Sequence, residues 1–70
     1  MFVSLLRNQA IRSDYKIQLW RTGDYQYCIE VVENGTVIDR SDLPNYDFDD
    51  AVKMFDRAVS EELRVGFVSN

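Results

Sequence analysis

The strongest constraint on the fold is a pair of alternating segments followed by an Asn-Gly turn. In residues 15–21 and again in residues 25–32, apolar side chains recur at every second position, which is the pattern of a half-buried β-strand. Asn34-Gly35 follows directly and favours the positive φ angles of a type I′ turn. A further short strand follows this turn. The sequence therefore predicts a three-stranded antiparallel meander over residues 15–40.

The alternation also assigns the two faces of this sheet. One face should carry Ile17, Leu19 and Ile29, which suits burial against a helix. The opposite face, which the helix leaves free, should carry Lys16, Gln18, Trp20, Gln26, Cys28, Glu30 and Val32. If the register differs from the expected one, the two sets of residues exchange faces. Trp20 is then a candidate partner-binding anchor, because tryptophan is enriched at interaction hot spots. The alternative is that the N-terminal segment covers it.

A helix is predicted over residues 47–63. Asp47 is a candidate N-cap, and Asp49 and Asp50 suit the first turn, where the helix dipole favours negative charge. Gly66 is a candidate stop signal, beyond which the chain can form a short edge strand or fray. One apolar stripe at spacings of three and four is formed by Phe48, Ala51, Val52, Phe55, Ala58, Val59 and Leu63.

Residues 2–12 have a less regular pattern. Their apolar spacing is mostly helical, although Phe2-Val3 also suits a strand. A short helix is slightly favoured, and the strand remains the alternative. The expected fold is thus a single α+β domain over residues 1–70, with a three-stranded antiparallel β-meander, one long C-terminal helix packed on one face, and a short N-terminal helix or strand.

Composition excludes several classes of protein. A chain of 70 residues buries only about 60% of the surface that its unfolded form exposes, so its stability should be modest. One cysteine and no histidine leave no internal disulfide and argue against a zinc site. Neither a signal-peptide core nor a stretch approaching the about 18 apolar residues of a membrane span is present. Cys28 fits a reducing, cytoplasmic location.

The sequence offers few residues suited to catalysis. The commonest general acid–base residue is missing because the chain has no histidine, and neither Cys28 nor the serines have an obvious activating base. The three glycines are scattered at positions 23, 35 and 66, so no phosphate-binding loop or dinucleotide fingerprint exists. The aspartates lack the spacing of a calcium loop. We expect no enzyme activity, no catalytic residues, no metal site and no cofactor.

The negative charge is concentrated in one part of the chain. Residues 1–38 carry four acidic and four basic residues, whereas residues 39–64 carry eight acidic and four basic residues, which accounts for the net charge of −4. Helix capping explains part of this cluster. The functional interpretation is that the cluster forms a surface that binds a basic protein partner, with electrostatic attraction guiding association. The candidate partner-binding residues are Asp39, Asp42, Tyr46, Asp47, Asp49, Asp50 and Trp20.

In size and charge the chain resembles small acidic α+β proteins of phages and mobile elements that inhibit host machinery, including anti-CRISPR proteins. This resemblance implies an inhibitor that occupies the basic nucleic-acid-binding surface of a partner protein. A homodimeric accessory module that pairs through its sheet is one alternative. Another is a small nucleic-acid-binding domain with the element order of double-stranded-RNA-binding domains, using Arg7, Arg12, Lys16 and Arg21. The acidic balance makes direct nucleic-acid binding the weakest of the three.

Overall fold

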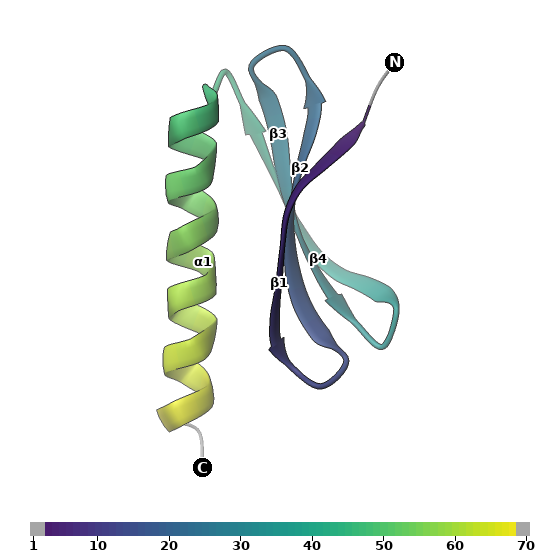
Figure 1. Ribbon diagram of the computed structural model, residues 1–70, viewed down its shortest axis with the longest axis vertical. Helices are drawn as coiled ribbons and strands as arrows, with labels where there is room; N and C mark the ends of the chain where they lie inside the picture. Colours follow the sequence, from purple (N-terminus) through teal and green to yellow (C-terminus); the bar gives the residue numbers. More distant parts are fainter. Residues whose placement is uncertain (1–2, 69–70) are drawn as a thin grey trace.

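Four β-strands precede one long α-helix in residues 3–68, the part of the chain that the computed structural model describes (Figure 1). The strands form one sheet in the order β1-β2-β3-β4, and each is antiparallel to the next. The predicted α+β class is confirmed, but the sheet has four strands instead of three. The elements are β1 (Ser4–Arg12), β2 (Tyr15–Gly23), β3 (Gln26–Glu33), β4 (Thr36–Pro44) and α1 (Phe48–Val68).

The N-terminal segment forms strand β1, so the short helix that its spacing favoured is wrong. Register shifts in the pairing with β2 leave Leu6 and Ile11 as extra residues in β1. Both side chains are partly buried against the core. Because each bulge interrupts the period of two, apolar residues follow one another at irregular intervals that imitate helical spacing. Phe2, which entered that pattern, lies outside the described residues.

The meander from β2 to β4 follows the predicted pattern, except that Tyr25 lies in the β2–β3 turn with a φ of 57° and not in the strand. Ile17 and Leu19 of β2 are both 0% exposed, and they pair with Val31 and Ile29 of β3. The turn between β3 and β4 has φ angles of 53° at Asn34 and 78° at Gly35, as a type I′ turn requires. Strand β4 continues to Pro44, four residues past the predicted end of the sheet.

Helix α1 begins where the capping pattern predicts. The Asp47 side chain is the N-cap, since its Oδ1 accepts a 2.8 Å hydrogen bond from the backbone N–H of Asp50. The helix runs on to Val68, past the predicted end at residue 63. Gly66 therefore does not stop it, and residues 65–68 are not an edge strand. A single glycine costs a helix only about 1 kcal/mol relative to alanine, which is too little to end it by itself.

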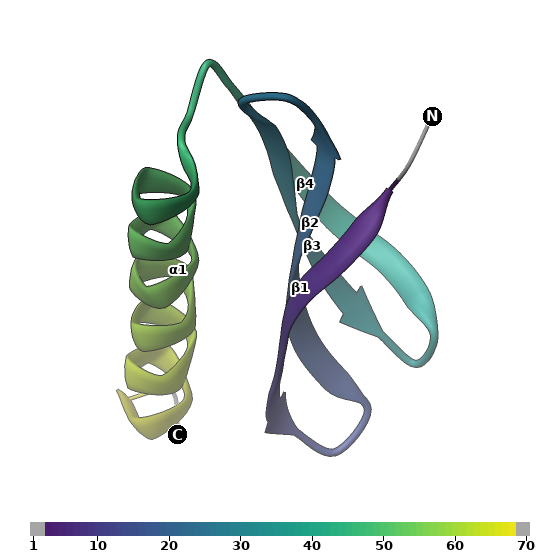
Figure 2. The ribbon, with the colours of Figure 1, turned by 45° about the horizontal axis from the view of Figure 1, so that its top comes forward.

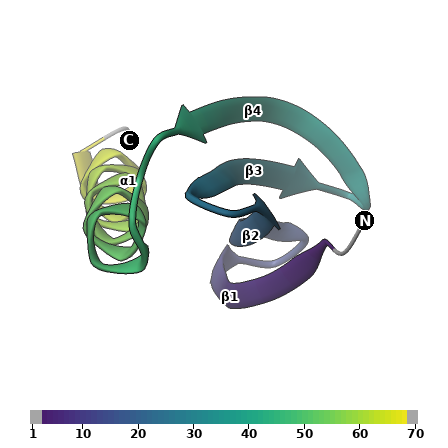
Figure 3. The same cartoon turned by 90° about the horizontal axis from the view of Figure 1, so that it is seen from above.

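The molecule has two layers, with α1 packed on one face of the twisted sheet (Figures 1 and 2). The helix backbone approaches β2 and β1 most closely. Viewed from above, the helix stands on one side of the four strands, and the β4–α1 connection leads across to it (Figure 3). The core between the layers consists of Ile17, Leu19, Tyr27, Ile29, Leu43, Ala51 and Phe55.

Candidate functional site

The acidic residues of β4 project from opposite faces of the sheet. Asp39 pairs with Val31, which lies opposite Ile17 on the helix-covered face. Asp42 pairs with Cys28, which lies opposite Trp20 on the other face. Side chains alternate along a strand, so residues separated by three positions point to opposite sides. These two candidate residues therefore cannot belong to one flat surface.

The remaining candidate aspartates lie at the start of α1. Asp47, Asp49 and Asp50 are all exposed, and Asp47 also caps the helix. Tyr46 is partly buried against the core, and its backbone N–H donates a 3.0 Å bond to the carbonyl of Tyr25. This bond ties the β4–α1 connection to the β2–β3 turn. The structure thus places the helix-start residues together but separates them from Trp20.

Trp20 lies in the middle of the face that α1 leaves uncovered. Strand β1 places Leu5 directly opposite it, and Leu5 is itself 44% exposed, so the N-terminal strand covers the indole in part. The indole Nε1 is buried and has no hydrogen-bond acceptor among the residues that the structure describes. An orphaned donor of this kind is unfavourable. The side chains on this face are therefore less completely packed and hydrogen-bonded than those beneath the helix.

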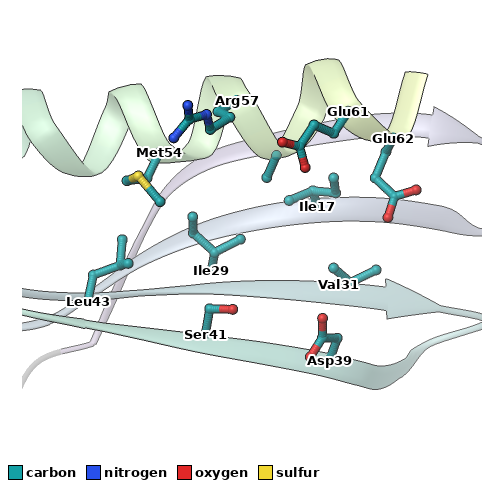
Figure 4. Close-up of a pocket in the computed structure, with 11 residues that line it drawn as sticks. Ile17, Ile29, Val31, Asp39, Ser41, Leu43, Met54, Arg57, Glu61 and Glu62 are labelled. Atoms are coloured by element: carbon teal, nitrogen blue, oxygen red, sulfur yellow. The ribbon is translucent and has the colours of Figure 1, made fainter. Parts of the chain in front are cut away.

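A groove opens between α1 and the β3–β4 half of the sheet. Its volume is about 350 Å³, within the range of small binding pockets. The sheet contributes apolar side chains from Ile17, Ile29, Val31 and Leu43. Figure 4 shows the side chains of Met54, Glu61 and Glu62 directed from α1 toward this sheet surface. The complete lining also includes Asp39, Ser41, Arg57 and Ala58.

The borders of the groove are mainly acidic. Asp39 lies on the β4 side, and Glu61 and Glu62 lie on the α1 side, against one guanidinium from Arg57. The Tyr15 hydroxyl donates a 3.1 Å hydrogen bond to Glu62 Oε1. Burial, followed by this bond and the charge of Glu62, raises the pKa of Tyr15 above its usual value of 10.0. Glu62 is thereby held at the end of the groove, while Asp39 and Glu61 are exposed.

The helix side of the groove was missed from the sequence. Met54, Arg57, Ala58, Glu61 and Glu62 lie three or four positions apart, so they share one helix face. The predicted apolar stripe runs beside that face and includes only Ala58 from it. A mixed stripe of this kind next to an apolar one is the signal that could have located the groove.

Three of the four basic residues considered for nucleic-acid binding contact side chains near them. The guanidinium of Arg7 lies 5.4 Å from the ring centroid of Phe48, and that of Arg12 lies 4.0 Å from the ring of Tyr15. Arg21 forms a 3.0 Å ion pair with Asp24. These side chains are engaged locally.

The described residues contain neither a membrane-spanning helix nor a cluster of metal ligands. No helix there is long and apolar enough to cross a membrane. No group of three or more metal-ligating side chains comes together in that part of the chain.

Comparison with known proteins found no matching family model, no matching curated protein and no matching solved structure.

Proposed function

We propose that this chain is a small, non-enzymatic protein-binding domain that docks an acidic surface on a basic surface of a partner protein. The observation that carries the proposal is the groove beside α1, in which an apolar floor is bordered by Asp39, Glu61 and Glu62. Apolar contact supplies binding energy that exposed charges alone do not, and the carboxylates select a basic partner. Inhibition of a nucleic-acid-binding protein, by occupying its basic surface, is the specific role that we propose.

The surface that we propose differs from the continuous stretch of residues 39–50 that the sequence indicated. Asp39 faces the groove, but Asp42 faces the other side of the sheet and already bonds Arg40 Nε at 3.2 Å. Asp47 is engaged in capping the helix. We therefore assign Asp39 and Glu61 the main electrostatic role, with Asp49 and Asp50 extending the acidic surface along the helix.

Affinity capture followed by mass spectrometry tests this function. The bait is the full chain, compared with an Asp39→Asn/Glu61→Gln variant and with an Asp42→Asn/Glu30→Gln control of equal charge, whose two positions lie on the face away from the groove. We expect the wild type and this control, confined to the opposite face, to recover the same basic nucleic-acid-binding protein. The groove variant should recover far less, and raising the salt to about 0.5 M should release the partner because ions screen exposed charges. Equal, salt-insensitive recovery by all three baits would contradict the proposal.

A homodimer that pairs through the sheet is the second candidate, and it is favoured by the outer edge of β4, which pairs with no other strand among residues 3–68. Arg40 and Asp42 lie on the same face of this strand. If two copies of β4 paired antiparallel about a two-fold axis at Ser41, Arg40 of each copy would lie opposite Asp42 of the other. Exposed Val37 and Ile38, at 48% and 51%, also leave this edge attractive for strand pairing.

Analytical ultracentrifugation tests the dimer directly. The wild type should sediment as a dimer at several hundred micromolar, Arg40→Glu should sediment as a monomer, and the exchange variant Arg40→Glu/Asp42→Arg should recover the dimer. A monomeric wild type at that concentration rules this candidate out.

A further inference from the structure

The width of the sheet leaves space for a second helix beside α1. Neighbouring strands lie about 4.8 Å apart, and a helix with its side chains is about 10 Å across. One helix therefore covers about two strands of a four-stranded sheet. Because α1 approaches β2 and β1 most closely, the less covered part of this face lies over β3 and β4. There Ile29 and Leu43 are buried, but Val31 is half-buried and Asp39 and Ser41 are exposed along the groove.

The surface of this groove is suited to the apolar stripe of a helix. Leu43 and Ile29 are nearly buried in its floor, and Val31 is half-buried. Met54 and Ala58 form the apolar part of the α1 wall. A helix lying in such a groove contacts it through residues at positions i, i+3, i+4 and i+7, as in other helix-in-groove complexes. Methionine adapts its shape to the side chains that it meets.

The borders determine the charge that this helix should carry. Asp39 lies along the β4 border, and Glu61 and Glu62 lie along the α1 border (Figure 4). A helix seated between them would place the residues that flank its apolar stripe next to these carboxylates. Lysine and arginine suit those positions, because their long stems can cover apolar surface while their charged ends reach outward. Arg57 favours one acidic residue in the partner, which would help to fix the register.

We propose that the groove binds a basic amphipathic helix of the partner protein, packed beside α1 over β3 and β4. This inference rests on the proposed function and adds the secondary structure, the charge pattern and the location of the bound segment. A second copy of this chain fits the groove less well. Residues 39–64 of that copy carry an excess of acidic residues, which the acidic borders of the groove would repel.

Nuclear magnetic resonance on the full-length chain, with isotope-labelled methyl groups, tests the proposal. The probe is a synthetic 14-residue helical peptide with leucine at positions 1, 4, 5, 8, 11 and 12 and lysine elsewhere; the control peptide has glutamate in place of lysine. We expect saturable shifts at Val31, Met54 and Ala58 with the lysine peptide only. Methyl groups on the opposite face, represented by Val32 and Val37, should stay within the noise.

Two charge reversals on the same strand sharpen this test. Asp39→Lys should weaken peptide binding about tenfold, since it converts an attraction into a repulsion at the groove border. Asp42→Lys makes the same charge change three residues away on the opposite face, and it should change the affinity less than about twofold. Equal loss in both variants would show that only net charge matters and would overturn the proposal.

Other outcomes are equally decisive. Shifts confined to the Trp20 face, or equal binding of the glutamate peptide, would also overturn it. So would concentration-dependent shifts of the groove methyl groups without peptide, which would identify a second copy as the occupant. If affinity capture recovers a basic partner that shifts the groove methyl groups but the lysine peptide does not shift them, this inference fails while the proposed function survives. If capture also recovers no basic partner, both fail.

Discussion

Cys28 shows how a single position is defined by its place in the sheet. It lies at the centre of the face away from α1, between Trp20 and Asp42, and it is only 2% exposed. Burial raises the pKa of its thiol above the usual 9.0, and the charge of Arg40 opposes that rise only in part. Burial keeps reagents away from the thiol, and the raised pKa lowers the fraction of thiolate, which is the reactive form. Cys28 should therefore be inert in the folded protein.

The reaction with a colourimetric disulfide reagent at about pH 8 measures this inertness. Cys28 should react at least tenfold more slowly in the folded protein than in denaturant. The Cys28→Ser/Ser41→Cys variant provides the control, because position 41 is exposed on the neighbouring strand. A wild-type thiol that reacts as fast as the thiol of that variant would contradict the burial of Cys28.

Tyr15 gives a stability that depends on pH. Its pKa is raised in the folded state, chiefly by burial and then by Glu62, so folding favours the protonated phenol. This contribution is fully present below the unfolded pKa of about 10 and is lost as the pH rises through the folded value. The free energy of unfolding should therefore fall more steeply between about pH 9 and pH 11 in the wild type than in Tyr15→Phe. Denaturant titrations at several pH values measure this, and parallel pH profiles would refute it.

At the scale of elements, the start of α1 depends on one side chain. The Asp47 carboxylate accepts the N–H of Asp50, and its carbonyl accepts the N–H of Ala51 at 3.0 Å. The first of these bonds satisfies a donor that the helix itself cannot satisfy. We therefore expect the side-chain oxygen of Asp47 to contribute more to the helix start than its charge does.

Replacing Asp47 separates these two contributions. Asp47→Ala should lower the free energy of unfolding by about 1 kcal/mol, whereas Asp47→Asn, which keeps a capping oxygen, should lose only a few tenths. Chemical denaturation followed by far-ultraviolet circular dichroism measures both values. Equal losses in the two variants would mean that charge near the helix dipole, and not the hydrogen bond, carries the effect.

The elements also differ in how well the sequence predicts them. The strands over residues 15–32 and the turn at Asn34-Gly35 follow from alternation and backbone preference, which are local properties. Strand β1 does not, because the bulges at Leu6 and Ile11 break its alternation. The end of α1 was also misjudged, since one glycine was given more weight than its small energetic cost supports.

At the scale of the whole molecule, the groove depends on where α1 sits across the sheet. The amphipathic pattern shows which side of the helix is buried, but it contains no information about which two strands lie beneath it. Local spacing could indicate that Asp39 and Asp42 face apart. Local spacing could not indicate that Asp39 of β4 and Glu61 of α1 line the same groove. That arrangement arises from packing between distant parts of the chain.

The central claim is that a groove over β3 and β4, lined by Val31 and Met54, is open to a partner beside α1. Solvent paramagnetic relaxation of methyl groups in the free protein, with an inert gadolinium chelate, tests it most directly. Val31 and Met54, which line the groove, should relax substantially, approaching exposed Val37, whereas Leu19 and Ala51 at 0% exposure should be protected. If Val31 and Met54 are as protected as Leu19 and Ala51, the helix covers the whole face, and the groove and the binding proposed for it are contradicted.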